Sequence, residues 1–167
     1  MNYMKLIKIM YVIDRMALIK WGRPVTFDSY FSMDNGPVLS RTLELIDEGS
    51  EYGSPWGELI LRAPNDPYSV TLRRDHSTDE LSQAEEELAS EIYAKLGHMN
   101  RWRIVDLLHQ ILPEWQNPHE SSLPISYRDI LRAAKKSEQE IAEIEFEIEG
   151  IALMEDLAIR DFVVVDD

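Results

Sequence analysis

The residues of this sequence best suited to chemistry are Asp106 and His109, which lie three positions apart in a predicted helix. At that spacing the carboxylate can orient the imidazole, which would make His109 the general base of a hydrolase or transferase. The alternative is structural. His109 shares a helical face with Val105 and Leu112, so it can be a core histidine that hydrogen-bonds to Asp106 or to a backbone carbonyl. We favour the structural interpretation and predict no catalytic residue.

Ligands for a metal ion and reactive thiols are scarce in this chain. It has no cysteine, which excludes disulfides, thiolate metal sites and a cysteine nucleophile. No two of the four histidines, His76, His98, His109 and His119, have the i, i+4 spacing of a helical zinc pair. We therefore predict no metal site and no cofactor.

Other patterns typical of enzymes or of nucleic-acid binding are also absent. The sequence has no glycine-rich phosphate loop, nucleophile elbow or Walker motif. Neighbouring acids such as Asp75 and Asp79 fit the solvated start of a helix better than a catalytic dyad. The basic residues form no helical stripe interleaved with aromatic residues. We predict that the protein is not an enzyme and does not bind nucleic acid.

The negative charge of the chain is concentrated in its second half. The formal net charge is −14, and of the 17 basic and 31 acidic residues, nine of each lie in residues 1–74. This leaves eight basic and 22 acidic residues in residues 75–167. Such a field repels phosphates and favours a basic protein partner, although surface acids also keep a small protein in solution.

The N-terminal segment predicts a folded helix. Apolar residues recur every three or four positions from Leu6 to Ala17, and charged residues interrupt them. We therefore expect neither a secretion signal nor a membrane span, and we expect a cytoplasmic protein. The helix should end at Gly22-Arg23-Pro24, because Gly22 can adopt a left-handed conformation and Pro24 cannot continue a helix.

The rest of the chain predicts further helices and one β-hairpin. A compact segment over residues 27–33 and a turn over 34–38 should lead into a second helix over 38–48. The hairpin pairs residues 58–62 with 68–72 across a turn rich in proline, asparagine and aspartate. Further helices are expected over residues 77–96, 102–112, 125–134 and 137–160, with a loop over 114–124.

Three of these helices carry recognisable caps. Ser77 or Thr78 suits the start of the third helix, and Ser126 suits the helix over 125–134. Ser137 with Glu140 three residues later forms a capping box before the long acidic helix.

The fold class that these elements predict is mainly α: a compact helical domain with one small β-hairpin. Residues 1–167 should form a single domain, with an acidic C-terminal helix over 137–160 and a short tail over 161–167. The hairpin should lie against the helices, because an isolated hairpin is only marginally stable. The apolar stripes place the following residues in one core: Leu6, Ile9, Ile13, Leu43, Leu88, Ile92, Val105, Leu108 and Ile144.

Short motifs along the chain resemble a known family. The first helix reads KLxKxxYxxD, and GRP, an aromatic segment and GPV follow it; the segment LLHQILPEW comes later. In this order and spacing the motifs resemble the Panacea domain, also described as SocA-like. The signature positions, which we interpret as structural, are Lys5, Tyr11, Asp14, Gly22, Arg23, Pro24, Tyr30, Gly36, Pro37, Val38, Asp106, His109 and Trp115.

The resemblance implies an antitoxin of a type II toxin–antitoxin pair, which neutralises a cognate protein toxin by direct binding. It also allows a SocA-like proteolysis adaptor, which would deliver the bound toxin to a protease. The expected partner is a basic toxin encoded by the neighbouring gene. We expect no membrane partner.

The C-terminal tail is the candidate contact with the toxin. Its residues Phe162, Val163, Val164 and Val165 are apolar and favour the β conformation. Apolar side chains at a free end are costly to leave in water. The tail should therefore dock as an edge strand on the chain's own hairpin or add a strand to a sheet of the partner.

Overall fold

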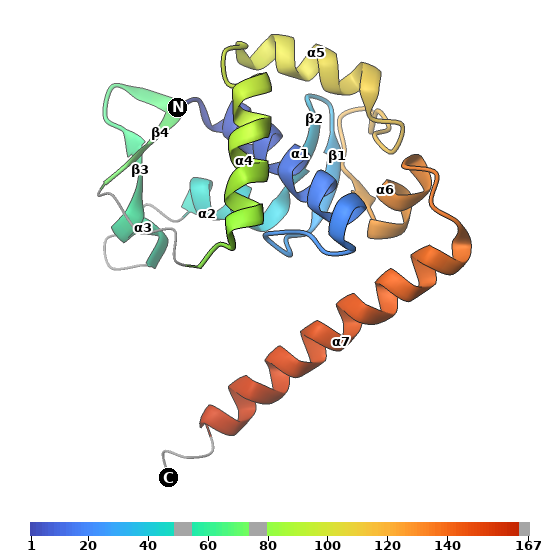
Figure 1. Ribbon diagram of the computed structural model, residues 1–167. Coiled ribbons are helices and arrows are strands. Elements are labelled where there is room, and N and C mark those ends of the chain that lie inside the picture. Colours follow the sequence, from blue (N-terminus) through green and yellow to red (C-terminus); the bar gives the residue numbers. More distant parts are fainter. Residues whose placement is uncertain (49–54, 74–79, 164–167) are drawn as a thin grey trace.

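The computed structural model describes the backbone of residues 1–48, 55–73 and 80–163 (Figure 1). These residues form seven helices and five strands. In chain order they are α1 (Tyr3–Trp21), β1 (Tyr30–Met33), β2 (Gly36–Leu39), α2 (Ser40–Glu48), α3 (Pro55–Leu59), β3 (Ile60–Ala63), β4 (Asp66–Leu72), α4 (Gln83–Leu96), α5 (Arg101–Ile111), β5 (Leu123–Ile125), α6 (Tyr127–Ala133) and α7 (Glu138–Val163).

Helix α1 lies at the centre of the molecule, in contact with α4, α5, α6 and β2 (Figure 1). The side chain of Asn2 caps its start by accepting a hydrogen bond from the backbone N–H of Lys5. Its end is as predicted, because Gly22 has a left-handed φ of +75° and donates its N–H to the carbonyl oxygen of Leu18. Because α4, α5, α6 and β2 contact this helix, it buries residues outside the single apolar stripe that the sequence predicts, among them Lys8, Tyr11 and Asp14.

A three-stranded antiparallel sheet, in the order β2-β1-β5, packs beside α1. Residues 27–33 and the start of the predicted second helix therefore contain strands that the sequence analysis did not predict. Strands β1 and β2 form a hairpin in which Met33 pairs with Gly36 across the turn residues Asp34 and Asn35. Strand β5 spans the end of the predicted loop and the first residue of the helix predicted over 125–134, and it pairs Ile125 with Tyr30.

Helix α2 begins at Ser40, two residues after the predicted start. Its first N–H groups are satisfied from upstream: Asp28 accepts hydrogen bonds from the backbone N–H groups of Arg41 and Thr42, at 2.8 and 2.9 Å. The hydroxyl of Thr42 donates to the same carboxylate at 2.7 Å. Residue Val38, expected at the helix start, instead lies in β2.

The predicted hairpin is confirmed with different ends: its first strand begins at Ile60, because Glu58 and Leu59 belong to α3, and its second strand begins at Asp66, two residues before the predicted start. Strands β3 and β4 pair in antiparallel register, and Val70 of β4 is buried. The hairpin is held to the N-terminus of the chain, because the terminal ammonium of Met1 donates to the carbonyl oxygen of Val70 at 2.6 Å. The fold is therefore mainly helical, with two small antiparallel sheets in the described residues where one hairpin was expected.

The predicted helix caps are confirmed at two of three places. Ser126 caps α6 in a capping box with Asp129, and Ser137 pairs reciprocally with Glu140 at the start of α7. Helix α4 starts at Gln83 with Ser82 as its cap, later than predicted. The expected caps Ser77 and Thr78 lie outside the described residues.

Most of the predicted core is buried or packs against the buried cluster. Ile9, Leu88, Ile92, Val105 and Leu108 are buried. The other four predicted core residues, Leu6, Ile13, Leu43 and Ile144, are partly buried and pack against this core.

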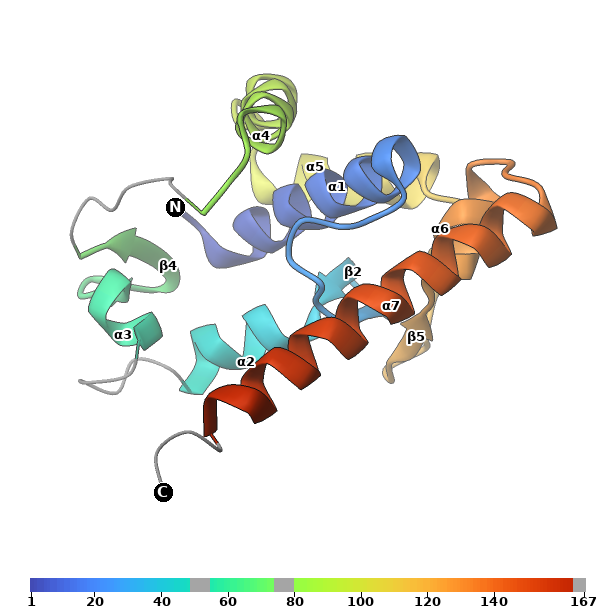
Figure 2. The same cartoon turned by 60° about the horizontal axis from the view of Figure 1, so that its bottom comes forward.

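Helix α7 starts beside α6 and runs away from it over a long distance (Figures 1 and 2). It buries Ile141 and Ile148 but leaves Phe146 exposed. The backbone of Phe162 and Val163 belongs to this helix, so the prediction of a β-prone tail from residue 161 is wrong for these two residues. Residues 164–167, with Val164 and Val165, lie outside the described residues.

Candidate functional site

The residues of the first sequence motif form a buried polar row along α1. Lys8, Tyr11 and Asp14 follow one another at intervals of three, which places them on one side of the helix. Each of these side chains is at most 1% exposed. Burying polar groups this completely requires hydrogen-bonding partners, and each of the three binds a different segment of the chain.

Asp14 fixes the segment that follows α1. Its Oδ1 accepts hydrogen bonds from the backbone N–H groups of Val25 and Thr26, both at 3.0 Å. Its Oδ2 accepts from the hydroxyl groups of Thr26 and of Tyr30, the latter at 3.0 Å. Burial raises the pKa of Asp14, and the hydrogen bonds from Thr26, Tyr30 and Val25 oppose that rise.

Tyr11 and Arg15 hold the segment after α5 through a buried carboxylate. The Tyr11 hydroxyl donates to Oε1 of Glu114 at 3.1 Å, and Nε of Arg15 donates to the same oxygen at 2.6 Å. Burial and the negative charge of Glu114 raise the pKa of Tyr11, so its hydroxyl remains a donor. The sequence analysis did not select Glu114 or Arg15, although Glu114 lies inside the recognised segment LLHQILPEW.

Lys8 holds the hairpin of β1 and β2. Its ammonium donates to the carbonyl oxygen of Pro37 at 2.7 Å, and burial lowers the pKa of Lys8 to about 7. Gly36 has a φ of +94°, and a Cβ there would lie 3.4 Å from Cε of Lys8 and 3.5 Å from Nε2 of His109. The absence of a side chain at Gly36 thus lets the lysine and the histidine approach the hairpin.

His109 does not form the predicted pair with Asp106. Asp106 is exposed, and within the described residues no hydrogen bond joins the two side chains. The imidazole instead stacks on Trp115, with ring centroids 3.8 Å apart, while its Nε2 is buried without a partner. The indole of Trp115 donates to the carbonyl oxygen of Met33 at 3.0 Å. Burial and the charge of Lys8 lower the pKa of His109, against the opposite effect of Asp106.

This environment departs from both sequence interpretations of His109. The indole of Trp115 stacks on its ring, where a hydrogen bond to Asp106 or to a backbone carbonyl was expected. A general base needs an oriented imidazole with an accessible nitrogen, and Nε2 is enclosed beside Gly36.

The remaining signature residues also connect elements of the fold. The Lys5 ammonium donates to the carbonyl oxygen of Gly97, and Arg23 pairs with Glu85 of α4 at 3.0 Å. Pro24 is buried, and Tyr30 packs edge-on against Tyr11 and Tyr127. A Cβ on Gly22 would contact Ile144 of α7 at 3.4 Å. The structure thus gathers most of the signature residues around α1, whereas Asp106 stands apart on the surface.

Other kinds of site are not apparent in the part of the chain that the structure describes. It contains no group of three or more histidines, aspartates or glutamates placed to hold a metal ion. None of its helices combines the length and the apolar composition that crossing a membrane requires. The proposed toxin contact through Phe162, Val163, Val164 and Val165 stays a prediction, since their side chains lie outside the described residues.

Comparison with known proteins gives one finding. Neither the curated proteins nor the solved structures contain a match to this chain. The family model described as "Antitoxin SocA-like, Panacea domain" matches residues 6–116, which is more than half of the chain. This range covers α1 from Leu6 onward, the β1–β2 hairpin, α4, α5 and Trp115, and so nearly all of the polar contacts around α1. The chain therefore belongs to the SocA-like antitoxin family, which is defined by the Panacea domain.

Proposed function

We propose that this protein is the antitoxin of a type II toxin–antitoxin pair and neutralises its cognate protein toxin by direct binding. The observation that carries this proposal is the family match over residues 6–116. All signature positions except Lys5 fall inside the matched range. Most of these residues make contacts within the fold, whereas Asp106 lies on the surface.

The roles of these residues favour a binding protein. Asp14, Tyr11, Lys8 and Trp115 direct their polar groups to other parts of the same chain. A reaction centre needs groups that face a substrate, and among the described residues the candidate dyad of Asp106 and His109 lacks the required hydrogen bond. The signature residues thus stabilise the fold, and we expect other residues, on the surface of that fold, to recognise the toxin.

The charge of the chain indicates the chemistry of the partner. The excess of acid in residues 75–167 makes a basic toxin the natural partner. Charge complementarity of this kind mainly accelerates encounter and contributes less to the lifetime of the complex. We therefore expect added salt to slow association of toxin and antitoxin more than it speeds their dissociation.

The proposal is tested by expressing the protein together with the product of the adjacent gene. The adjacent product alone should arrest growth, co-expression should restore growth, and the two proteins should co-purify. Persistent arrest with both proteins present and no complex would overturn the proposal. The amount of toxin separates two mechanisms, because a SocA-like adaptor would make the toxin disappear through a protease, whereas occlusion leaves it intact in the complex.

A further inference from the structure

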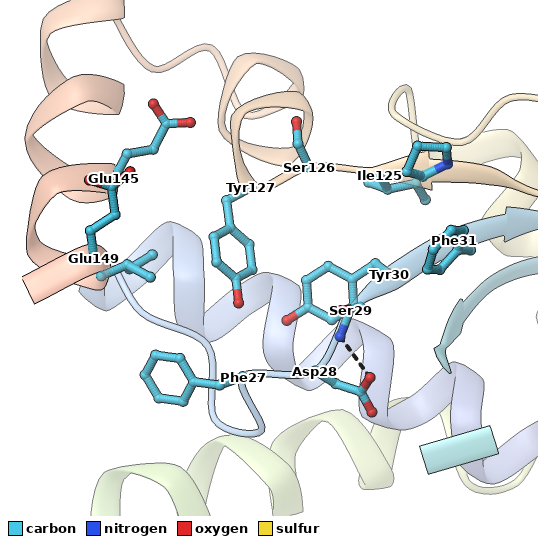
Figure 3. A pocket seen from close by; sticks show the side chains of 12 residues that line it. Phe27, Asp28, Ser29, Tyr30, Phe31, Ile125, Ser126, Tyr127, Glu145 and Glu149 are labelled. Atoms are coloured by element: carbon cyan, nitrogen blue, oxygen red, sulfur yellow. Dashed lines mark hydrogen bonds between the residues drawn. The ribbon is translucent and has the colours of Figure 1, made fainter. Parts of the chain in front are cut away.

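A groove of about 510 Å³ opens between the segment before β1, the segment around β5, and α7. Aromatic residues line it, among them Phe27, Tyr30 and Tyr127. Figure 3 shows the side chains of Phe27 and Tyr127 directed into the same space, with Glu145 and Glu149 projecting from α7 beside them. The groove therefore combines aromatic faces with carboxylates along one wall.

Phe27 is presented to this groove by a strained and well-anchored backbone. Its φ is +51°, a region nearly closed to a bulky aromatic residue, and the residue is 38% exposed. The residues on both sides are held: Thr26 binds Asp14, and the backbone N–H of Asp28 donates to the Thr26 hydroxyl. Strain of this kind persists where surrounding contacts enforce it, and it is concentrated at functional positions.

One carboxylate on the wall of the groove is available to a ligand. Asp28 is occupied by the N–H groups at the start of α2, and Glu145 is paired with Arg128. Glu149 is exposed and has no hydrogen bond or ion pair with the described residues. The Tyr127 hydroxyl also has no hydrogen-bond partner among them.

We propose that this groove receives an arginine side chain of the toxin, whose guanidinium packs on the rings of Phe27 and Tyr127 and pairs with Glu149. The inference rests on the proposed antitoxin function. A guanidinium is planar, stacks on aromatic faces and donates several hydrogen bonds to carboxylates, so it suits this combination better than an ammonium does. A basic partner is also what the net charge of −14 favours, because an acidic surface attracts basic side chains.

The position of the groove relative to the family match also suits a specificity site. Phe27 and Tyr30 lie inside residues 6–116, whereas Tyr127 and the α7 wall lie after the end of the match. The framework shared by the family thus supplies one wall. The other wall belongs to a segment outside the family model, and it can differ with the toxin.

Two variants with matched controls test the groove in the full chain. Phe27→Ala and Glu149→Gln change the groove. Phe146→Ala and Glu147→Gln make the same chemical changes at exposed positions of α7 that do not line it. Surface plasmon resonance against the adjacent gene product should show a Kd raised about tenfold for each groove variant, the size expected when a cation–π contact or a charge-assisted hydrogen bond is lost. Each control should stay within about twofold of the wild type.

The possible outcomes separate the groove from the proposed function. If the groove variants bind like the wild type while their urea midpoints are unchanged, or if the controls weaken binding as much, the groove is not the contact. If the wild type does not bind the adjacent product, the proposed function fails. The groove is then tested by nuclear magnetic resonance with N-acetyl-L-argininamide, which should shift signals of Phe27 and Tyr127 more than the neutral N-acetyl-L-citrullinamide. Equal shifts with the two compounds would overturn the groove proposal.

Discussion

Removing the carboxylate of Asp14 should be one of the most destabilising single substitutions in this chain. Asp14→Ala deletes the acceptor of four hydrogen bonds, two from backbone N–H groups and two from the hydroxyls of Thr26 and Tyr30. Thr26 is exposed, so water can replace its lost bonds, but Tyr30 is only 3% exposed and its hydroxyl would be left without a partner.

The loss in the free energy of unfolding can be estimated from the number of hydrogen bonds removed and from whether water can replace them. An unsatisfied buried donor costs about 1–3 kcal/mol, and each hydrogen bond that water replaces is worth about 0.5–1.5 kcal/mol. Burial raises the pKa of Asp14, which means that its charged form is itself costly to bury and that the net loss is smaller than the sum of the bonds. We expect Asp14→Ala to lower the free energy of unfolding by about 3–4 kcal/mol. Tyr30→Phe, which removes one hydrogen bond and leaves no donor unpaired, should cost about 1 kcal/mol.

Urea unfolding monitored by tryptophan fluorescence measures these changes. Asp106→Ala is the matched control, because Asp106 is exposed and its substitution should stay within about 0.5 kcal/mol of the wild type. If Asp14→Ala lowers the free energy of unfolding no more than the control does, the idea that this carboxylate holds the segment after α1 is refuted. A loss for Tyr30→Phe equal to that of Asp14→Ala would assign the whole effect to one bond.

Three further predictions concern the hairpin, the buried lysine and the C-terminus. Gly36→Val should lower the free energy of unfolding, measured by thermal unfolding, by about 1–3 kcal/mol, because φ is +94° and the new side chain would press on Lys8. Its control is Gly150→Ala, where a Cβ meets nothing within 4 Å, and this change should raise the free energy of unfolding by up to about 1 kcal/mol. The pKa of Lys8 is lowered from 10.5 to about 7, so the unfolded chain binds more protons between these values. The free energy of unfolding should therefore rise with pH across this window, by up to about 1.4 kcal/mol per pH unit, and Lys8→Met should remove that slope; an unchanged slope would contradict the assignment. Deleting Phe162–Asp167 should weaken neutralisation in the growth assay while the urea midpoint is retained, and full neutralisation by the truncated chain would remove this segment from the toxin contact.

Features of the fold that depend on neighbouring residues were predictable from the sequence. The end of α1 at Gly22 and the capping boxes at Ser126 and Ser137 each depend on residues within one helical turn. The hairpin of β3 and β4 was predictable for the same reason, since its turn residues lie between its strands.

Features that depend on distant residues were not predictable. Strand β1 pairs with β2 across a short local turn, but it also pairs with β5, where Tyr30 meets Ile125, and no local pattern in the sequence predicts that second pairing. Pro37 argues against a strand, yet β2 is the edge of its sheet, which is where a proline is tolerated. The spacing of Asp106 and His109 suggested a pair, but the stacking of His109 on Trp115 depends on how the chain turns after α5.

The buried contacts of α1 and the proposed toxin groove are physically connected. Asp14 accepts hydrogen bonds from Val25 and Thr26, and Thr26 in turn binds the N–H of Asp28, so Phe27 sits between fixed neighbours. Because a side chain that is already held in its binding conformation loses little entropy on association, this anchoring favours binding at Phe27. The family signature would then influence toxin recognition without contacting the toxin. A folded Asp14→Asn variant should accordingly bind the adjacent gene product more weakly than Asp106→Asn does. Adding Phe27→Ala to Asp14→Asn should reduce the affinity by a smaller factor than adding it to the wild type, because part of the contribution of Phe27 to binding is already lost. Full additivity of the two substitutions would show that the α1 contacts and the groove act independently.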